Sequence, residues 1–521
     1  MEFVDFCCND IVSKSQIDFL VRLNHQPRKG LLPFRHTIII ITTPGLLKGN
    51  EMKKALILLS VSFALLVVVF ALSSCGVLLN QAGLYEGFEY VVDSEYEITL
   101  TGYKGENTRI EIPAWIDGYK VVAIDFDEND PTLANIESIK IPKTIVSLTP
   151  YTFAPCVNLK EITVALDNPE YKYLHGALYS KDGKTLVYYP QAREDEELVL
   201  GKRITKIGEN AFRDARYLKR VTLEGVEEIS STAFVGCSAL ESVDFGTKLK
   251  KIGDSAFEGC SLLTEINIPN SAEHVGVYAF RGCTGVSSIS LGSGMRYVGY
   301  EAFENLDNVS GITEFGGANY LGNSENPYVL LVKLINKAQK SCHVHSSANV
   351  IYASAFEGCA ALETVEIPHH LTCIGRRAFY GCKSLKAIAL PEGMDVVDEY
   401  AFYGCSSIVE LEIPSSVTKI ESYAFSDCKA LESLTLSDRT RTIARMAFFG
   451  CSALTDVTLP DTVSYIGDLA FSGCSSLLYL RFTAAEGWII GGVPTDLSDP
   501  EAAAVIMQTQ VSALTKAAPE L

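Results

Sequence analysis

The chain has 521 residues, with 63 acidic side chains against 44 basic ones and a formal net charge of −19. Such an acidic excess repels phosphate backbones and excludes nucleic acid as a partner. The chain contains no Walker phosphate loop, Gly-x-Ser-x-Gly elbow or His-Glu-x-x-His motif, so we expect neither enzymatic activity nor a cofactor.

Residues 52–75 have the form of an export signal. Two lysines precede an apolar run over residues 55–72, and the segment ends in Leu-Ser-Ser-Cys at Cys75. A positive start followed by an apolar centre is typical of a signal peptide. The ending resembles the bacterial lipobox, which implies that Cys75 is diacylated, becomes the first mature residue and anchors the protein to the membrane. A retained helical anchor is the alternative, because a run of eighteen apolar residues is borderline for a membrane span.

Residues 1–51 precede this signal and match no repeat. A signal peptide belongs at an N-terminus. Residues 48–51, Lys-Gly-Asn-Glu, would be encoded by a purine-rich stretch like a ribosome-binding site directly before Met52. We therefore expect residues 1–51 to be a non-native upstream extension.

A 23-residue repeat governs the chain from Ala211 to Phe471. The pair Ala-Phe occurs eleven times there, and its spacing is 23 residues apart from one step of 22 and one of 53. Self-similarity at this period is typical of a solenoid, in which each coil buries its apolar face against its neighbours. We predict a β-rich repeat solenoid over residues 131–482, with short parallel strands stacked in a curved, right-handed coil.

Residues 385–407 serve as the type unit. The unit opens on Leu-x-x-Ile-x-Leu-Pro, and the first two apolar slots recur in coil after coil. This alternation predicts a short half-buried strand, and strands one coil apart would pair about 4.8 Å from each other in a parallel sheet. The proline would end the strand, because it donates no ladder hydrogen bond. In the second half of the unit, the small Ala allows close coil packing and the Phe fills the core.

Nine of the eleven Ala-Phe pairs are followed three residues later by a cysteine, and Cys156 follows Phe153 in the same way. This single register position predicts a ladder of reduced, buried thiols, because a free Cys behaves as a small hydrophobe. Disulfides between adjacent rungs are the alternative, since fifteen cysteines in an exported chain would ordinarily form a framework. A catalytic thiol needs its own base, so the repetition argues against a nucleophile.

Other segments depart from the period. Residues 76–130 repeat raggedly and are predicted to form an N-terminal cap. We expect insertions near residues 168–200, with a hairpin about Asp182-Gly183, and near residues 306–350. After residue 482 the repeat stops, and Ser-Asp-Pro-Glu at residues 498–501 predicts a helix to about residue 517 within a C-terminal cap of residues 483–521. We expect Trp488, in this cap, to lie in the core.

Two sets of residues are candidates for binding. Outward strand positions form a polar, partly acidic face that could bind a ligand or merely be solvated: Glu265, Asn267, Glu366, Glu410, Glu412, Thr435, Asp456 and Thr458. The second set borders the second insertion, where stacked imidazoles and a thiol could meet around a transition metal: His345, His369, His370 and Cys373. These four are weak candidates, because ordinary turn residues at an insertion border would look the same, and we expect no metal.

The unit Leu-x-x-Ile-x-Ile-Pro, Ile-Gly, Ala-Phe-x-Gly-Cys resembles the BspA-like leucine-rich repeats of bacterial surface proteins, from about Ile110 to Phe482. The interruptions that begin at Asn168 and Asn319 also look like those of family members. The resemblance implies a leucine-rich repeat solenoid at the cell surface, linked in some members to adhesion, including binding of host matrix proteins and of other bacteria. It offers no catalytic residues.

We therefore expect an exported, surface-exposed lipoprotein, anchored to the bacterial cell envelope by the lipid on Cys75, that binds an extracellular protein or glycan. Two alternatives stay open, because repeats specify shape only. They are a periplasmic or surface-layer structural scaffold, and a glycan-capture lipoprotein serving a transporter.

Overall fold

The computed structural model describes residues 82–94, 96–303, 306–509 and 512–516. The chain divides into two units, Met1–Gly76 and Val77–Leu521, and every described residue belongs to the second. The predictions for residues 1–51, for the signal peptide of residues 52–75 and for Cys75 lie outside the described residues. Within the described ranges, no helix has the length and apolar composition that a membrane crossing requires.

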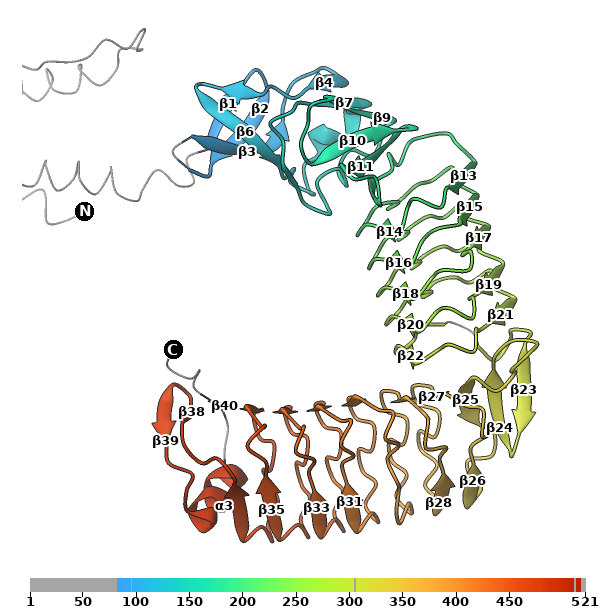
Figure 1. The fold of residues 1–521 in the computed structure, drawn as a ribbon, viewed down its shortest axis with the longest axis vertical. Coiled ribbons are helices and arrows are strands. Elements are labelled where there is room, and N and C mark those ends of the chain that lie inside the picture. Colours follow the sequence, from blue (N-terminus) through green and yellow to red (C-terminus); the bar gives the residue numbers. More distant parts are fainter. Residues whose placement is uncertain (1–81, 95, 304–305, 510–511, 517–521) are drawn as a thin grey trace, which may run out of the picture. The chain divides into compact units, whose positions relative to one another are not determined.

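The second unit is a β-solenoid, as predicted, and Figure 1 shows its coils stacked one upon the next with two rows of strands on opposite sides. The short-strand row consists of two-residue strands: β14 (Lys206–Ile207), β16 (Glu228–Ile229), β18 (Lys251–Ile252), β20 (His274–Val275), β22 (Tyr297–Val298), β27 (Val350–Ile351), β29 (Cys373–Ile374), β30 (Val396–Val397), β32 (Lys419–Ile420), β34 (Thr442–Ile443) and β36 (Tyr465–Ile466). The long-strand row consists of strands of three or four residues: β13 (Glu197–Leu200), β15 (Arg220–Leu223), β17 (Ser242–Asp244), β19 (Glu265–Asn267), β21 (Ser288–Ser290), β26 (Ser341–His343), β28 (Thr364–Glu366), β31 (Glu410–Glu412), β33 (Ser433–Thr435), β35 (Asp456–Leu459) and β37 (Tyr479–Phe482).

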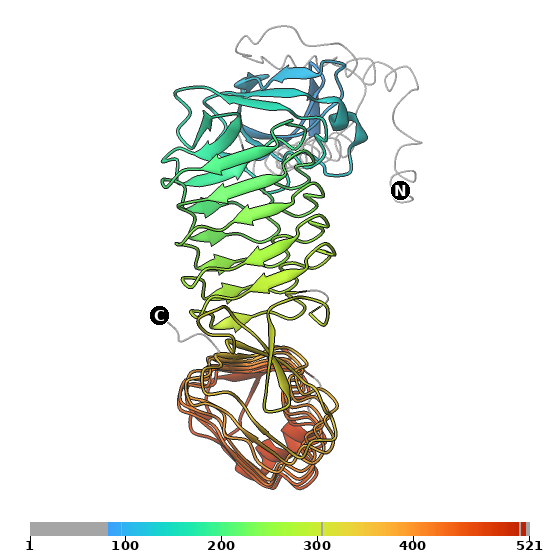
Figure 2. The same cartoon turned by 90° about the vertical axis from the view of Figure 1, so that its right-hand side faces the viewer.

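Within each sheet of the two rows, neighbouring strands pair in parallel with an offset of one coil. Ile229, Ile252 and Val275 are register partners along the short-strand row, as are Leu411 and Leu434 along the long-strand row. All five side chains are buried. The pairing is parallel because each 23-residue coil returns the chain to the same register in the same direction. Figure 2 shows the first strands of the long-strand row one above another.

The prediction of a strand at the start of the type unit was wrong, because residues 385–390 form no regular strand. Ala387 and Ala389 stand at its outward positions, where β31 presents Glu410 and Glu412. Alanine is poor in strands, since it offers little surface to pack against a cross-strand neighbour. The long-strand row is therefore interrupted between β28 and β31.

The phenylalanines of the Ala-Phe pairs form two stacks through the core. From Phe212 to Phe303, neighbouring ring centroids lie 4.5–5.5 Å apart with interplanar angles of 2–10°. From Phe356 to Phe471 the corresponding values are 4.7–5.5 Å and 5–11°. The backbone follows the same ladder, because the Phe N–H donates to the Ala carbonyl of the next coil from Phe212 to Phe280 and from Phe356 to Phe448, as from Phe379 to Ala401 at 2.7 Å. At the second insertion the Phe303 N–H donates to the Tyr352 hydroxyl instead.

A ladder of free thiols runs beside these rings, as predicted. All twelve cysteines of the described residues are free and buried. In eight of them the thiol donates to the carbonyl oxygen of a phenylalanine in the preceding coil, at Sγ···O distances of 3.0–3.4 Å: Cys237, Cys260, Cys283, Cys382, Cys405, Cys428, Cys451 and Cys474. Cysteine suits this position because it is small and apolar yet retains a weak donor.

The residue before each Ala-Phe pair adopts a left-handed backbone. At all eleven positions φ lies between 48° and 60°, and none of them is glycine: Asn210, Thr232, Ser255, Tyr278, Glu301, Ser354, Arg377, Tyr400, Tyr423, Met446 and Leu469. This conformation costs a residue with a Cβ roughly 1–2 kcal/mol. A ladder hydrogen bond offsets the cost, as from Ser255 N–H to the Val277 carbonyl at 2.8 Å.

Both predicted insertions are three-stranded antiparallel units. The first consists of β10 (Tyr171–Leu174), β11 (Ala177–Ser180) and β12 (Thr185–Tyr188), and the predicted hairpin about Asp182-Gly183 joins its last two strands. The second consists of β23 (Ile312–Phe315), β24 (Ala318–Leu321) and β25 (Leu330–Leu334). In each case the last strand pairs in parallel with the short-strand row, so the insertion is built into the stack.

At the N-terminal end, β1 (Ala82–Tyr85), β2 (Phe88–Val92) and β3 (Glu97–Tyr103) form an antiparallel meander. Parallel pairing begins with β3 and β6 (Tyr119–Ile124), and with β4 (Arg109–Glu111), β7 (Ser138–Ile141) and β9 (Glu161–Val164). The short elements β5 (Trp115–Ile116), β8 (Ser147–Leu148) and η1 (Pro131–Asn135) complete this end.

At the C-terminal end, α3 (Pro500–Thr509) begins where predicted, and the Asp499 carboxylate accepts the N–H of Glu501 at 3.0 Å. The prediction of a helix to residue 517 was wrong, because Leu514–Lys516 forms strand β40. That strand pairs antiparallel with β36 and with β38 (Trp488–Ile490), which also pairs with β39 (Val493–Thr495). It occupies the edge of the short-strand row, which would otherwise leave backbone groups unpaired. Trp488 is buried, as predicted.

Candidate binding surfaces

The predicted polar face lies on the long-strand row. Glu265, Asn267, Glu366, Glu410, Glu412, Thr435 and Thr458 are exposed, and Asp456 is half-buried. From β31 to β37 the outward positions form two ladders over four coils. The first is Glu410–Ser433–Asp456–Tyr479, and the second consists of the pair Glu412–Thr435 followed by the pair Thr458–Arg481. The alternation of the strands places these side chains outside the core.

Two acidic members of this face have side-chain partners. Arg481 forms an ion pair with Asp456, and its guanidinium lies 5.1 Å from the centroid of the Tyr479 ring. The imidazole of His343 lies 2.7 Å from the carboxylate of Glu366. The face therefore combines acids and hydroxyls with one arginine–tyrosine pair at its C-terminal end.

The four weak metal candidates occupy different surroundings. The His345 ring stacks on Tyr328 at 3.7 Å between centroids, His369 and His370 are exposed on a turn, and Cys373 is buried on β29. Among the described residues, no three His, Cys, Asp or Glu side chains are grouped so that they could hold a metal ion.

Sequence reasoning missed a cavity of about 460 Å³ beside the short-strand row. The row is broken here, since one sheet ends at β22, a second ends at β29 and a third begins at β30. Hydrogen bonds join the two sides of the break. The Thr372 hydroxyl donates to the Arg296 carbonyl at 2.7 Å, and the Asn349 amide donates to the Ser293 carbonyl at 2.8 Å.

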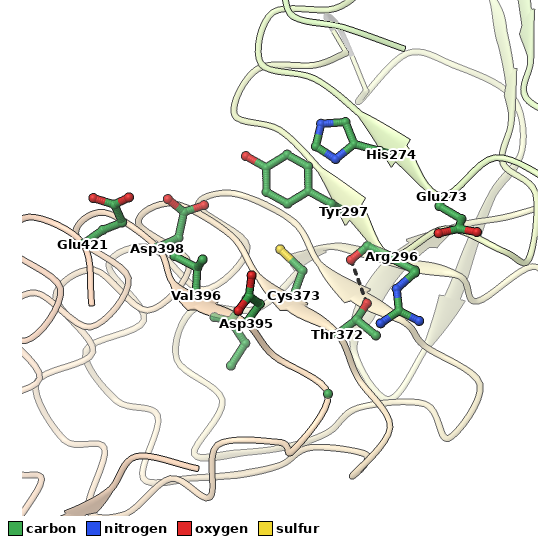
Figure 3. Close-up of a pocket in the computed structure, with 12 residues that line it drawn as sticks. Glu273, His274, Arg296, Tyr297, Thr372, Cys373, Asp395, Val396, Asp398 and Glu421 are labelled. Carbon is green, nitrogen blue, oxygen red and sulfur yellow. Dashed lines mark hydrogen bonds between the residues drawn. The ribbon is translucent and has the colours of Figure 1, made fainter. Parts of the chain in front are cut away.

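Aromatic and acidic side chains face each other across this cavity (Figure 3). Tyr297 and His274 come from β22 and β20, and their rings stack at 4.6 Å between centroids and 12° between planes. Asp398 and Glu421 follow β30 and β32, and Cys373 on β29 lies between the two groups. Residues from five coils thus line one space.

Burial and neighbouring charges shift the pKa values of the titratable side chains that line this cavity. Burial, with the charge of Glu421, raises the pKa of the Asp398 carboxyl to about 6. Burial also raises the pKa of the Cys373 thiol and of the Tyr297 hydroxyl, and the charge of Asp398 acts on both in the same direction. The pKa of His274 is lowered by burial and by Lys251. Near neutral pH the thiol, the phenol and the imidazole are therefore uncharged.

Asp398 and Glu421 stand where most coils carry glycine: Gly208, Gly253, Gly276, Gly299, Gly375 and Gly467. A Cβ at Gly253 would lie 2.4 Å from the backbone nitrogen of Ser231 in the preceding coil, so close packing favours glycine there. The presence of two acids at this position in consecutive coils was the feature of the sequence that could have indicated the cavity. It went unrecognised because the lining is assembled from coils up to about 150 residues apart, between His274 and Glu421.

A family model described as BspA type leucine rich repeat region matches residues 132–172, 191–314 and 349–478, in six copies. These ranges cover more than half of the chain. The chain belongs to the BspA-type leucine-rich repeat family. No curated protein matches it.

Three solved structures of bacterial leucine-rich repeat proteins resemble the chain. A leucine rich cell surface protein from Faecalibacterium prausnitzii A2-165 matches 78% of this chain and 95% of its own, with 22% identity and a TM-score of 0.27. A protein from Bacteroides ovatus ATCC 8483 matches 76% and 94%, with 23% identity and a TM-score of 0.32. One from Eubacterium ventriosum ATCC 27560 matches 78% and 96%, with 18% identity and a TM-score of 0.28.

The BspA-type match omits residues 173–190 and 315–348, which carry inserted strands. The cavity lies between BspA-type repeats on either side of the second omission. His274 and Tyr297 belong to the second matched stretch, and Cys373, Asp398 and Glu421 to the third. The second insertion is therefore what separates the two walls along the sequence.

Proposed function

We propose that this chain is an exported, lipid-anchored repeat protein of the bacterial cell envelope that binds an extracellular protein or glycan and catalyses no reaction. The lysine pair, apolar run and Cys75 of residues 52–75 support export and lipid attachment. Membership of the BspA-type leucine-rich repeat family supports a binding role, since stacked repeats present extended surfaces.

The observation that carries the proposal is the polar face over β31, β33, β35 and β37. Its outward residues stay in register over four coils and contribute nothing to the buried core. At its end, Tyr479 and Arg481 lie together, and tyrosine and arginine are among the residue types enriched at the energetic centres of interfaces. A ligand bound at this end of the face would contact both the aromatic ring of Tyr479 and the charged hydrogen-bond donors of Arg481.

Binding of the full-length protein, purified in detergent, to arrays of matrix proteins and glycans tests this assignment. We expect at least one ligand to be captured, and Tyr479→Ala to weaken its binding about 30-fold, which corresponds to a hot-spot loss of about 2 kcal/mol. Tyr465→Ala is the matched control, because Tyr465 and Tyr479 are each 37% exposed but stand on opposite rows. Capture of no ligand, or equal loss in both variants, would refute the assignment.

Localisation is tested separately by treating intact cells with protease. A surface lipoprotein is degraded under these conditions, whereas a periplasmic scaffold is protected until the outer barrier is opened. Retention of the whole protein on intact cells would contradict surface display and favour the scaffold or the transporter-linked alternative.

A further inference from the structure

The cavity between β22 and β30 is a separate site from the polar face and has its own chemistry. Its volume of about 460 Å³ falls within the range of about 300–1,000 Å³ that holds small ligands or single side chains. One wall is the stacked pair of Tyr297 and His274, and the opposite wall carries Asp398 and Glu421. An aromatic wall facing carboxylates suits a ligand group that is both positively charged and partly apolar.

The charges of the lining favour a cation. Four carboxylates line the cavity, Glu273, Asp395, Asp398 and Glu421, against the single guanidinium of Arg296. In Figure 3, Arg296 lies at the other end of the cavity from Asp398. Lys419 pairs with Glu421, but within the described residues no ion pair involves Asp398, whose Oδ1 accepts only the backbone N–H of Glu399 at 2.7 Å. Glu273 and Asp395 likewise form no ion pair among the described residues, but of these three carboxylates Asp398 is the one that faces the aromatic wall at the end of the cavity away from Arg296. A ligand beside Tyr297 would therefore meet Asp398 without displacing a protein cation.

We propose that this cavity binds an organic cation, an ammonium or guanidinium group that lies against the Tyr297 ring and pairs with Asp398. The aromatic ring attracts a cation within about 6 Å of its centroid, and the half-buried carboxylate supplies a charge-assisted hydrogen bond. An inorganic metal ion suits the site less well, since no metal-ligating cluster occurs among the described residues. The group can come from a free amine or from a basic side chain of a peptide.

The substitution pattern of the repeat supports a role for Asp398 beyond folding. Five of the other coils from Gly253 to Gly467 carry glycine at this position, where a Cβ crowds the backbone of the preceding coil. An acid there is not needed for coil packing. Returning the position to glycine therefore removes the carboxylate while keeping the residue that the repeat prefers.

Titration calorimetry with the full-length protein tests the site, with agmatine as the probe for a free cation. A second arm uses a short peptide that carries one central arginine and is blocked at both ends, and its citrulline counterpart serves as the uncharged control. We expect saturable binding of agmatine, of the arginine peptide, or of both, and no binding of the citrulline peptide. Binding of agmatine alone assigns a free amine, and binding of the arginine peptide assigns a side chain.

Two variants locate the binding. Asp398→Gly and Tyr297→Leu are each expected to weaken the cation about tenfold or more, whereas Asp438→Asn, on an exposed turn, is expected to leave it unchanged. Circular dichroism and thermal unfolding establish that each variant is folded. Equal affinity in all three variants, binding of the citrulline peptide, or absence of binding in both arms would overturn the proposal.

The pH dependence gives a second readout that a purely structural role of Asp398 would not produce. Burial, with the charges of Glu421 and Glu399, raises the pKa of Asp398, whereas the Glu399 N–H and Arg376 oppose this shift. Tyr297 and Cys373 stay uncharged nearby. With a pKa of about 6, the carboxyl is mostly protonated at pH 5 and ionised at pH 7.5. Affinity is therefore expected to rise about tenfold between these pH values, and protonation of His274 at low pH acts in the same direction. An Asp398→Gly variant with the same pH profile would contradict this mechanism.

Discussion

Replacing Phe402 with alanine would test the central packing device of the solenoid. The Phe402 side chain is fully buried, and its ring stacks at 5.2 Å on both Phe379 and Phe425, with interplanar angles of 6° and 5°. Truncation of a buried Phe costs about 3–5 kcal/mol, because the transfer energy is lost and a cavity remains. Each of the two stacking contacts accounts for about 0.5–1.5 kcal/mol beyond the area that it buries.

The loss should be local, because each coil of a solenoid contacts only its neighbours. Hydrogen exchange of the native protein therefore measures it better than a single unfolding midpoint, since repeat arrays need not unfold in one step. We expect the amides of the coils that carry Phe379 and Phe425 to exchange about a hundred- to several-thousand-fold faster, the equivalent of 3–5 kcal/mol. Amides of the coil that carries Phe234, in the other stack, should be unchanged.

A double-mutant cycle isolates the stacking. The combined loss in Phe379→Ala plus Phe402→Ala should fall short of the sum of the single losses by about 0.5–1.5 kcal/mol, because the contact between the two rings can be lost only once. Phe245→Ala supplies the comparison, since Phe245 is buried but meets its neighbours edge-on, at 88° and 89°. Strict additivity, or an exchange effect spread evenly over all coils, would refute the stacked-ring account.

Three further outcomes follow from the same contacts. The twelve described thiols should resist a thiol reagent at pH 8 in the native protein and all react in denaturant, since all are buried, and burial raises the pKa of Cys382 and Cys474 to about 12; a deficit of free thiols would indicate disulfides. Burial raises the pKa of Asp398 from 3.8 to about 6, so ionisation of this carboxyl destabilises the folded protein increasingly as the pH rises through this interval. Asp398→Gly should therefore raise the thermal midpoint more at pH 7.5 than at pH 4. An equal shift at both pH values would count against the buried carboxylate. Asp499→Ala should destabilise α3 by about 1 kcal/mol, seen as faster amide exchange within the helix, whereas Asp499→Asn keeps an acceptor and should cost little; an equal effect of both would contradict the cap.

Repetition made most of the fold predictable. The Ala-Phe spacing predicted the coils, and the position of Cys405 and its equivalents predicted a buried thiol ladder, which the structure contains. The shared repeat pattern also concealed the coils that depart from it. Residues 385–390 match the repeat yet form no regular strand, because Ala387 and Ala389 replace its usual outward residues. The helix prediction overran Thr509, because only the unpaired edge of β36 draws residues 514–516 into a strand.

The Ala-Phe pairs and the cysteine register thus determined the solenoid and its core from the sequence alone, because each coil packs against a near copy of itself 23 residues away. The polar face was predictable for the same reason, since strand alternation decides which side chains point outward. The cavity was decided by the tertiary structure. It exists where the second insertion breaks the short-strand row and brings Tyr297 opposite Asp398, which lie about a hundred residues apart in the chain. No local sequence pattern predicts that Tyr297 lies opposite Asp398, because this arrangement depends on how the two blocks of repeats join across the break.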